Sequence, residues 1–71
     1  MYIDRQYLKN TVLKVSQEKN IINATKKIQQ MCGVPWYVIY DFTRKATPNE
    51  ESLLKIIKCL NIDTVKLFVI N

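Results

Sequence analysis

The sequence predicts a compact all-α domain of five helices, formed as one unit over residues 1–71. Two prolines and one glycine leave little room for the many turns that a small β fold needs. Apolar residues make up 48% of the chain, which is ample for a core, and they recur at helical spacing. A chain of this length lies near the lower limit for a core that holds without cross-links.

The first two helices are indicated by apolar residues three and four positions apart. Asp4 can cap a helix that runs to about Lys19. The inner face of this helix is formed by Leu8, Val12 and Val15. A second helix covers residues 23–32, and its apolar stripe is formed by Ala24, Ile28, Met31 and Cys32. Gly33 then fits the left-handed position just past a helix end.

The third helix starts at Pro35, which suits a first helical position because its missing N–H is not needed there. One side of this helix is formed by Pro35, Val38, Ile39 and Phe42. The opposite side carries Tyr37, Tyr40, Asp41 and Arg44, with Trp36 and Thr43 at the margins. The aromatic and basic groups are therefore expected to point mostly away from the core.

Two further helices complete the predicted fold. The fourth begins at Thr47, through a capping box, or at Asn49 as the alternative cap. Its inner stripe is formed by Leu53, Ile56, Ile57 and Leu60. Asn61 is expected to end this helix in the left-handed conformation, and Asp63 to cap a short fifth helix through Leu67 and Phe68.

The missing residue types disfavour several classes of protein. There is no histidine and no glycine-rich phosphate loop, so we expect no enzyme and no cofactor. Two cysteines are too few for a structural zinc site, so no metal is expected either. We expect Cys32 and Cys59 to be reduced core residues, with a disulfide as the alternative. No apolar run could span a membrane and no secretion signal is visible, which predicts a cytoplasmic protein.

The charge is distributed unevenly along the chain. The whole formal net charge of +5 lies in residues 1–47, because three lysines and three acids balance in the remainder. A basic portion of this kind suits a polyanionic partner, and solvated surface lysines are the alternative interpretation.

Two short helices joined by a glycine turn, the second exposing polar and aromatic groups, describe a helix-turn-helix motif over about residues 23–44. The run from about Asn23 to Phe68 resembles the phage repressor and Cro-like (lambda repressor-like) DNA-binding domains, over about two thirds of the chain. The matching features are Ile28 five residues before Gly33, Gly33-Val34, Ile39, Phe42, a basic link ending at Pro48, and LLKIIKCLNIDTVKLF. The departures are Gln29 for the usual alanine, Pro35 for a Ser or Thr cap, and Lys45 near a usual glycine.

The resemblance implies sequence-specific binding to double-stranded DNA by a small transcriptional repressor of phage or mobile-element type. The helix after Gly33 would enter the major groove. Its base-facing residues would be Trp36, Tyr37, Tyr40 and Asp41. Phosphate contacts would come from Thr25, Lys26, Lys27, Arg44 and Lys45, and from N–H groups at the start of the second helix.

Other partners fit parts of the same pattern. A protein–protein module, such as an antitoxin or an adaptor, could dock through the same aromatic face. A membrane-surface protein using the basic first helix is disfavoured by the core-like apolar stripes there. The segment formed by Leu67, Phe68, Val69 and Ile70 is more apolar than one short helix can bury, which predicts a homodimer through it. The alternative is a C-terminal segment folded onto its own core.

Overall fold

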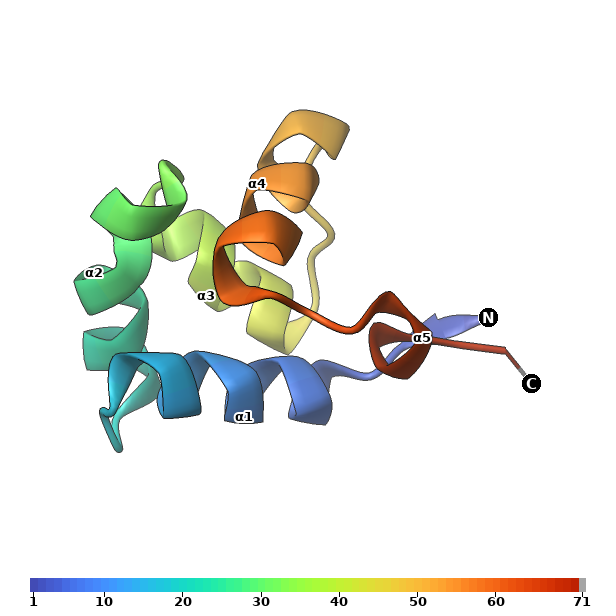
Figure 1. The fold of residues 1–71 in the computed structure, drawn as a ribbon, viewed down its shortest axis with the longest axis horizontal. Helices are drawn as coiled ribbons and strands as arrows, with labels where there is room; N and C mark the ends of the chain where they lie inside the picture. The colour runs from blue at the N-terminus through green and yellow to red at the C-terminus, as the bar shows by residue number, and fades with distance from the viewer. Residues whose placement is uncertain (71) are drawn as a thin grey trace.

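The computed structural model describes residues 1–70, which form a small, mostly helical domain (Figure 1). The described elements are β1 (Tyr2–Ile3), α1 (Arg5–Ser16), α2 (Ile21–Cys32), α3 (Trp36–Arg44), α4 (Glu50–Leu60), α5 (Thr64–Leu67) and β2 (Phe68–Val69). In Figure 1, α1 lies along the lower edge and the other three long helices lie on one side of it. The five predicted helices are confirmed, whereas the two strands were not predicted.

The helix starts are set by single polar side chains. Asp4 accepts a hydrogen bond from the N–H of Tyr7 at 3.0 Å and caps α1, as predicted. Asp63 caps α5 in the same way, through the N–H of Val65. At α4 the cap is Asn49, which accepts from the N–H of Ser52, so the alternative start was correct and Thr47 is not the cap.

Helix α2 starts earlier than predicted. Asn20 accepts hydrogen bonds from the N–H groups of Ile22 and Asn23, at 2.9 and 3.1 Å, and therefore caps a helix that begins at Ile21. An asparagine directly before two isoleucines is a sequence signal that could have located this start. The far end of α2 is as predicted, with Gly33 in the left-handed conformation.

One core lies between the four longer helices and α5. Its fully or nearly buried apolar residues are Leu8, Val12, Ala24, Ile28, Cys32, Val34, Ile39, Phe42, Ile56, Leu60, Ile62 and Leu67. Three residues predicted to face inward are exposed instead: Val15 (40% of its surface), Met31 (55%) and Pro35. Val15 and Met31 lie at the edges of the apolar arcs of α1 and α2, whereas Pro35 precedes α3 and does not follow the periodicity of that helix.

Strands β1 and β2 join the two ends of the described chain. They are antiparallel, with Tyr2 opposite Val69 and Ile3 opposite Phe68. Ile3 and Phe68 are partly buried against the core, whereas Tyr2 is about half exposed. Neighbouring side chains on a strand point to opposite faces, so this register presents Ile3 and Phe68 to the helices. The C-terminal segment is therefore packed against its own chain.

The first turn of α1 is fastened to distant parts of the fold. The Nη1 atom of Arg5 donates to the carbonyl oxygens of Phe42 and Ala46, at 2.7 and 2.9 Å. These carbonyls belong to the last turn of α3 and the residues after it, where a helix leaves its acceptors unsatisfied and favours a positive charge. The hydroxyl of Tyr7 accepts from the N–H of Asp63 at 3.0 Å. Arg5 and Tyr7 therefore hold α3 and α5 in place.

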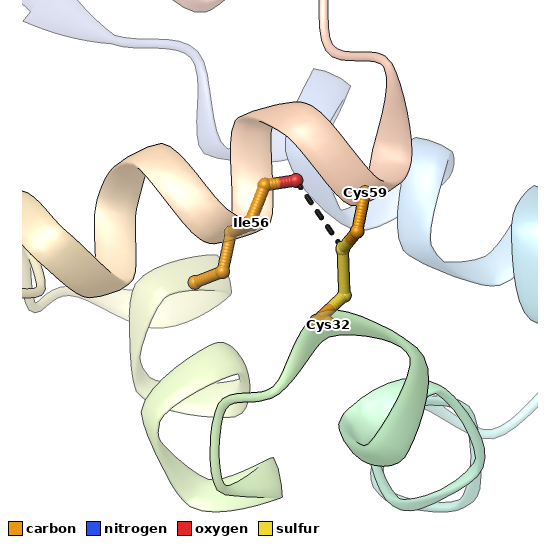
Figure 2. The surroundings of a disulfide bond; sticks show 3 residues. All are labelled: Cys32, Ile56 and Cys59. Carbon is orange, nitrogen blue, oxygen red and sulfur yellow. Dashed lines mark hydrogen bonds between the residues drawn. A yellow bond between two sulfur atoms is a disulfide. The ribbon is translucent and has the colours of Figure 1, made fainter.

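Cys32 and Cys59 form a disulfide, which corrects the prediction of two reduced core cysteines. Figure 2 shows the bond joining the end of α2 to the last turn of α4. The burial of Cys32 is confirmed, and Cys59 is half-buried. Their Cα atoms lie 5.3 Å apart, inside the range that a disulfide spans. Helical periodicity gave the face on which each cysteine lies, but it carries no information on how two helices are brought together.

Candidate nucleic-acid interface

The turn between α2 and α3 depends on the backbone of Gly33. This residue has φ of 68°, and its N–H donates to the carbonyl oxygen of Gln29 at 2.9 Å. The N–H of Val34 donates to the same oxygen at 3.3 Å. A β-carbon at Gly33 would meet no atom within 4 Å, so glycine is needed for its left-handed conformation and not for space. The turn is short, and α3 begins at Trp36.

The first N–H of α3 is satisfied from the preceding helix. Pro35 precedes the helix and has no polar side chain with which to cap it. The amide oxygen Oε1 of Gln29 instead accepts a hydrogen bond from the N–H of Trp36 at 3.2 Å. The sequence marked Gln29 and Pro35 as separate departures from the family pattern. In the structure, the glutamine side chain supplies the acceptor that the proline lacks.

The predicted base-facing residues are brought together along α3. The ring of Trp36 lies 6.2 Å from that of Tyr37, edge to face, and 6.2 Å from that of Tyr40, with the planes tilted by 48°. Tyr37 exposes 55% of its surface, and Trp36, Tyr40 and Asp41 are half-buried. On the other side of the helix, Ile39 and Phe42 are fully buried. The predicted division of α3 into a core side and an aromatic side is confirmed.

Two cations flank the aromatic rings. The Nζ atom of Lys26, on α2, lies 4.9 Å from the centre of the Trp36 ring. The guanidinium carbon of Arg44 lies 5.3 Å from the centre of the Tyr40 ring. Both distances allow a cation–π attraction. We call this group the aromatic–basic face, formed by Lys26, Trp36, Tyr37, Tyr40 and Arg44.

The remaining predicted phosphate contacts divide into exposed and buried groups. Lys27 and Lys45 are exposed, on α2 and just past α3. Thr25 is fully buried and its hydroxyl donates to the carbonyl oxygen of Ile22 at 2.8 Å, so its prediction as a phosphate contact is wrong. A threonine that satisfies its hydroxyl within its own helix can lie in a core.

The start of α2 offers less to a phosphate than predicted. The N–H groups of Ile22 and Asn23 are both occupied by the side chain of Asn20. A helix N-terminus attracts an anion chiefly through N–H groups that have no other acceptor. The N–H groups of these two residues are therefore removed from the predicted set of phosphate contacts.

The residues predicted to form a dimer interface are not equally available. Leu67 is fully buried in the core of its own chain, which corrects its place in that interface. Phe68 and Val69 are half-buried and pair with β1. Ile70 exposes 82% of its surface. The prediction assumed that this segment forms only a short helix, whereas α5 and β2 together bury more of its apolar surface than a short helix could.

None of the helices in residues 1–70 has the length and apolar character required to cross a membrane. The same residues contain no group of three or more metal-ligating side chains. Comparisons of the chain with protein-family models, with curated proteins and with solved structures found no match.

Proposed function

We propose that this protein binds double-stranded DNA sequence-specifically, as a small transcriptional repressor of phage or mobile-element type. The observation that carries the proposal is the aromatic–basic face, which unites residues of α2 and α3 on the side of α3 opposite Phe42. The resemblance of the sequence to the phage repressor and Cro-like helix-turn-helix domains supports it independently. Under this proposal α2 and α3 form the helix-turn-helix, and α3 lies in the major groove.

The chemistry of the face suits both parts of DNA recognition. The hydroxyls of Tyr37 and Tyr40 donate or accept at base edges, and the Trp36 ring packs against thymine methyl groups. Asp41 accepts from the amino group of cytosine and repels phosphate, so it contributes discrimination more than affinity. Lys26 and Arg44 contact phosphates at the two ends of the aromatic row, where they fix the orientation of the helix. Lys27 and Lys45 extend these phosphate contacts.

A selection from random duplexes tests the proposal. We expect an enriched sequence whose affinity falls steeply with salt, because bound cations are released from the phosphates. Tyr37→Ala should weaken binding to that sequence by about 1–3 kcal/mol without changing stability. Leu54→Ala is a matched control, because Leu54 is similarly exposed (57% against 55%) but lies on α4. A selection with no enriched sequence, or equal losses for the Tyr37 and Leu54 variants, contradicts the proposal.

Docking to a protein, as in an antitoxin or an adaptor, is the second candidate. The exposed ring of Tyr37 beside Trp36 favours it, because aromatic side chains are enriched at protein interfaces. Salt separates the two candidates, since an aromatic docking face loses little affinity as salt rises. Binding that survives high salt and requires Tyr37 would therefore favour the protein partner.

We further propose that the repressor acts as a cytoplasmic homodimer on two half-sites about one helical turn apart. With Leu67 buried, the contact falls on the exposed side of β1 and β2 and on Ile70. Sedimentation at high micromolar concentration tests this arrangement. A monomer that persists in the presence of DNA contradicts it.

A further inference from the structure

The disulfide lies between the two helices that flank α3 in sequence. Cys32 is the last residue of α2, and Trp36 follows only four positions later, after the turn at Gly33. Cys59 lies in the last turn of α4. The chain segment enclosed by the bond contains the turn, the whole of α3 and nearly all of α4. The bond therefore fixes the last turn of α4 to the end of α2, four residues before α3 begins.

Helix α4 is attached to the domain mainly through its C-terminal half. Ile56 and Leu60 are buried, whereas Leu53, one turn earlier on the same face, is only partly buried against the core. Ile56 and Leu60 belong to the same core cluster as Phe42, the residue on which α3 rests. The disulfide lies in this same half of α4 (Figure 2). Loosening α4 at this end would therefore open the core cluster to which Phe42 of α3 also belongs.

The effect of the bond on the unfolded chain is large for a domain of this size. It closes a loop between residues 27 positions apart. Loop closure of that length favours the folded state roughly 400-fold in the folding equilibrium. Small domains have folded-to-unfolded ratios of about 10³ to 10⁸, so the bond supplies a substantial part of that ratio.

We propose that the Cys32–Cys59 disulfide is a redox switch that clamps α4 onto α2, and that reduction by a dithiol releases α4. A thiolate of the dithiol attacks Sγ of Cys59, the more exposed cysteine, and the S–S bond breaks. Sγ of Cys32 leaves as a thiolate and takes a proton. The second thiol of the reductant then displaces Cys59 as a thiol. The reductant departs as a disulfide, having given two electrons.

The local structure accommodates the reduced state chemically. Sγ of Cys59 lies 3.5 Å from the carbonyl oxygen of Ile56, the contact drawn in Figure 2. A disulfide sulfur has no proton to donate there, but the thiol formed by reduction has one. The thiol of Cys32 remains among apolar side chains, which a cysteine tolerates. The two redox states thus differ chiefly in the tether between α2 and α4.

Amide hydrogen exchange on the whole chain, with and without dithiothreitol, tests the switch. In the reduced protein we expect the amides of Ile56 and Leu60 to exchange at least tenfold faster than those of Leu8 and Val12. In the oxidised protein the two sets should exchange at similar rates, because the cross-link opposes separate release of α4. Equal acceleration of both sets, or none, overturns the proposal.

A double variant, Cys32→Ala with Cys59→Ala, is the control. It should show the exchange pattern of the reduced protein and should not respond to dithiothreitol. A response would mean that the reductant acts elsewhere, which overturns the proposal. If the variant is too unstable for exchange rates to be measured, the same comparison of exchange rates in α4 and α1 is made on the reduced natural chain.

The consequence for DNA rests on the proposed function. Reduction should lower the affinity for the selected duplex at least tenfold, because α3 loses part of the core on which it rests. An oxidised protein that binds no duplex contradicts the proposed function, while hydrogen exchange still decides the switch. If the oxidised protein binds the duplex and keeps that affinity on reduction, although α4 is released, then the disulfide does not control DNA binding.

Discussion

The side chain of Gln29 and the backbone N–H of Trp36 form a hydrogen bond of 3.2 Å across the turn between α2 and α3. A helix commonly begins with a Ser, Thr, Asp or Asn that caps its own first turn. Here the acceptor comes from the preceding helix, because Pro35 has none to offer. The start of the aromatic–basic face is thus held directly by α2.

Gln29→Ala should therefore destabilise the domain by about 1 kcal/mol, the usual cost of losing a helix cap. Denaturant unfolding measures this change. Gln30→Ala is the matched control, because Gln30 is exposed on the same helix. If the two variants unfold at the same denaturant concentration, the bond from Gln29 contributes nothing to the fold.

Phe42→Ala should cost roughly 3–5 kcal/mol, enough to unfold most of a domain this small. Phe42 is the largest of the fully buried side chains, and its removal leaves a cavity beneath α3. Tyr37→Ala, on the exposed side of the same helix, should melt within a few degrees of the parent. Thermal melts of the two variants decide this prediction. If Tyr37→Ala melts early and Phe42→Ala melts like the parent, the assignment of the buried and exposed sides of α3 is wrong.

Arg5→Ala should lower stability by about 1.5–3 kcal/mol, the range for hydrogen bonds made by a charged group. The guanidinium donates to the carbonyls of Phe42 and Ala46 at the end of α3. Lys9→Ala, one turn further along α1, removes an exposed cation and is the control. Equal unfolding midpoints for the two variants would show that the contacts of Arg5 are too weak to matter.

Arg44→Ala should weaken binding to all DNA sequences alike and should flatten the dependence of log affinity on log salt by about one unit. Lys58→Ala removes an exposed cation from α4 and should leave that slope unchanged. Titrations at several salt concentrations give both slopes. A loss confined to the selected sequence would mean that Arg44 contacts a base.

Local signals in the sequence predicted the fold well. Gly33 and Asn61 both end helices in the left-handed conformation, and Asp4 and Asp63 both cap helices. Each of these roles depends on one residue and its immediate neighbours. The division of α3 into a buried and an exposed side was equally visible, because Phe42 and Tyr37 lie on opposite faces of any helix through them.

Features that depend on distant partners could not be predicted in this way. A strand of two residues is too short to show the alternation of apolar and polar residues that marks a strand, so the sequence did not reveal β1 and β2. The disulfide requires that the C-terminal ends of α2 and α4 lie close together, and the sequence of neither helix alone predicts this proximity. The phosphate contact of Thr25 was implied by the family resemblance and its place on the second helix, whereas its hydroxyl bonds within α2. The role of Arg5 depends on carbonyls that only the folded α3 presents.

The fastening of the first turn of α1 has a consequence for the order of folding. The contacts that shape the α2–α3 pair join residues close in sequence, and such contacts form early because the loops they close are short. Arg5 and Tyr7, in contrast, bond to groups 37, 41 and 56 positions away. During synthesis from the N-terminus, these side chains emerge before the groups to which they bond. Arg5 and Tyr7 are thus expected to be among the last residues of the domain to reach their native contacts.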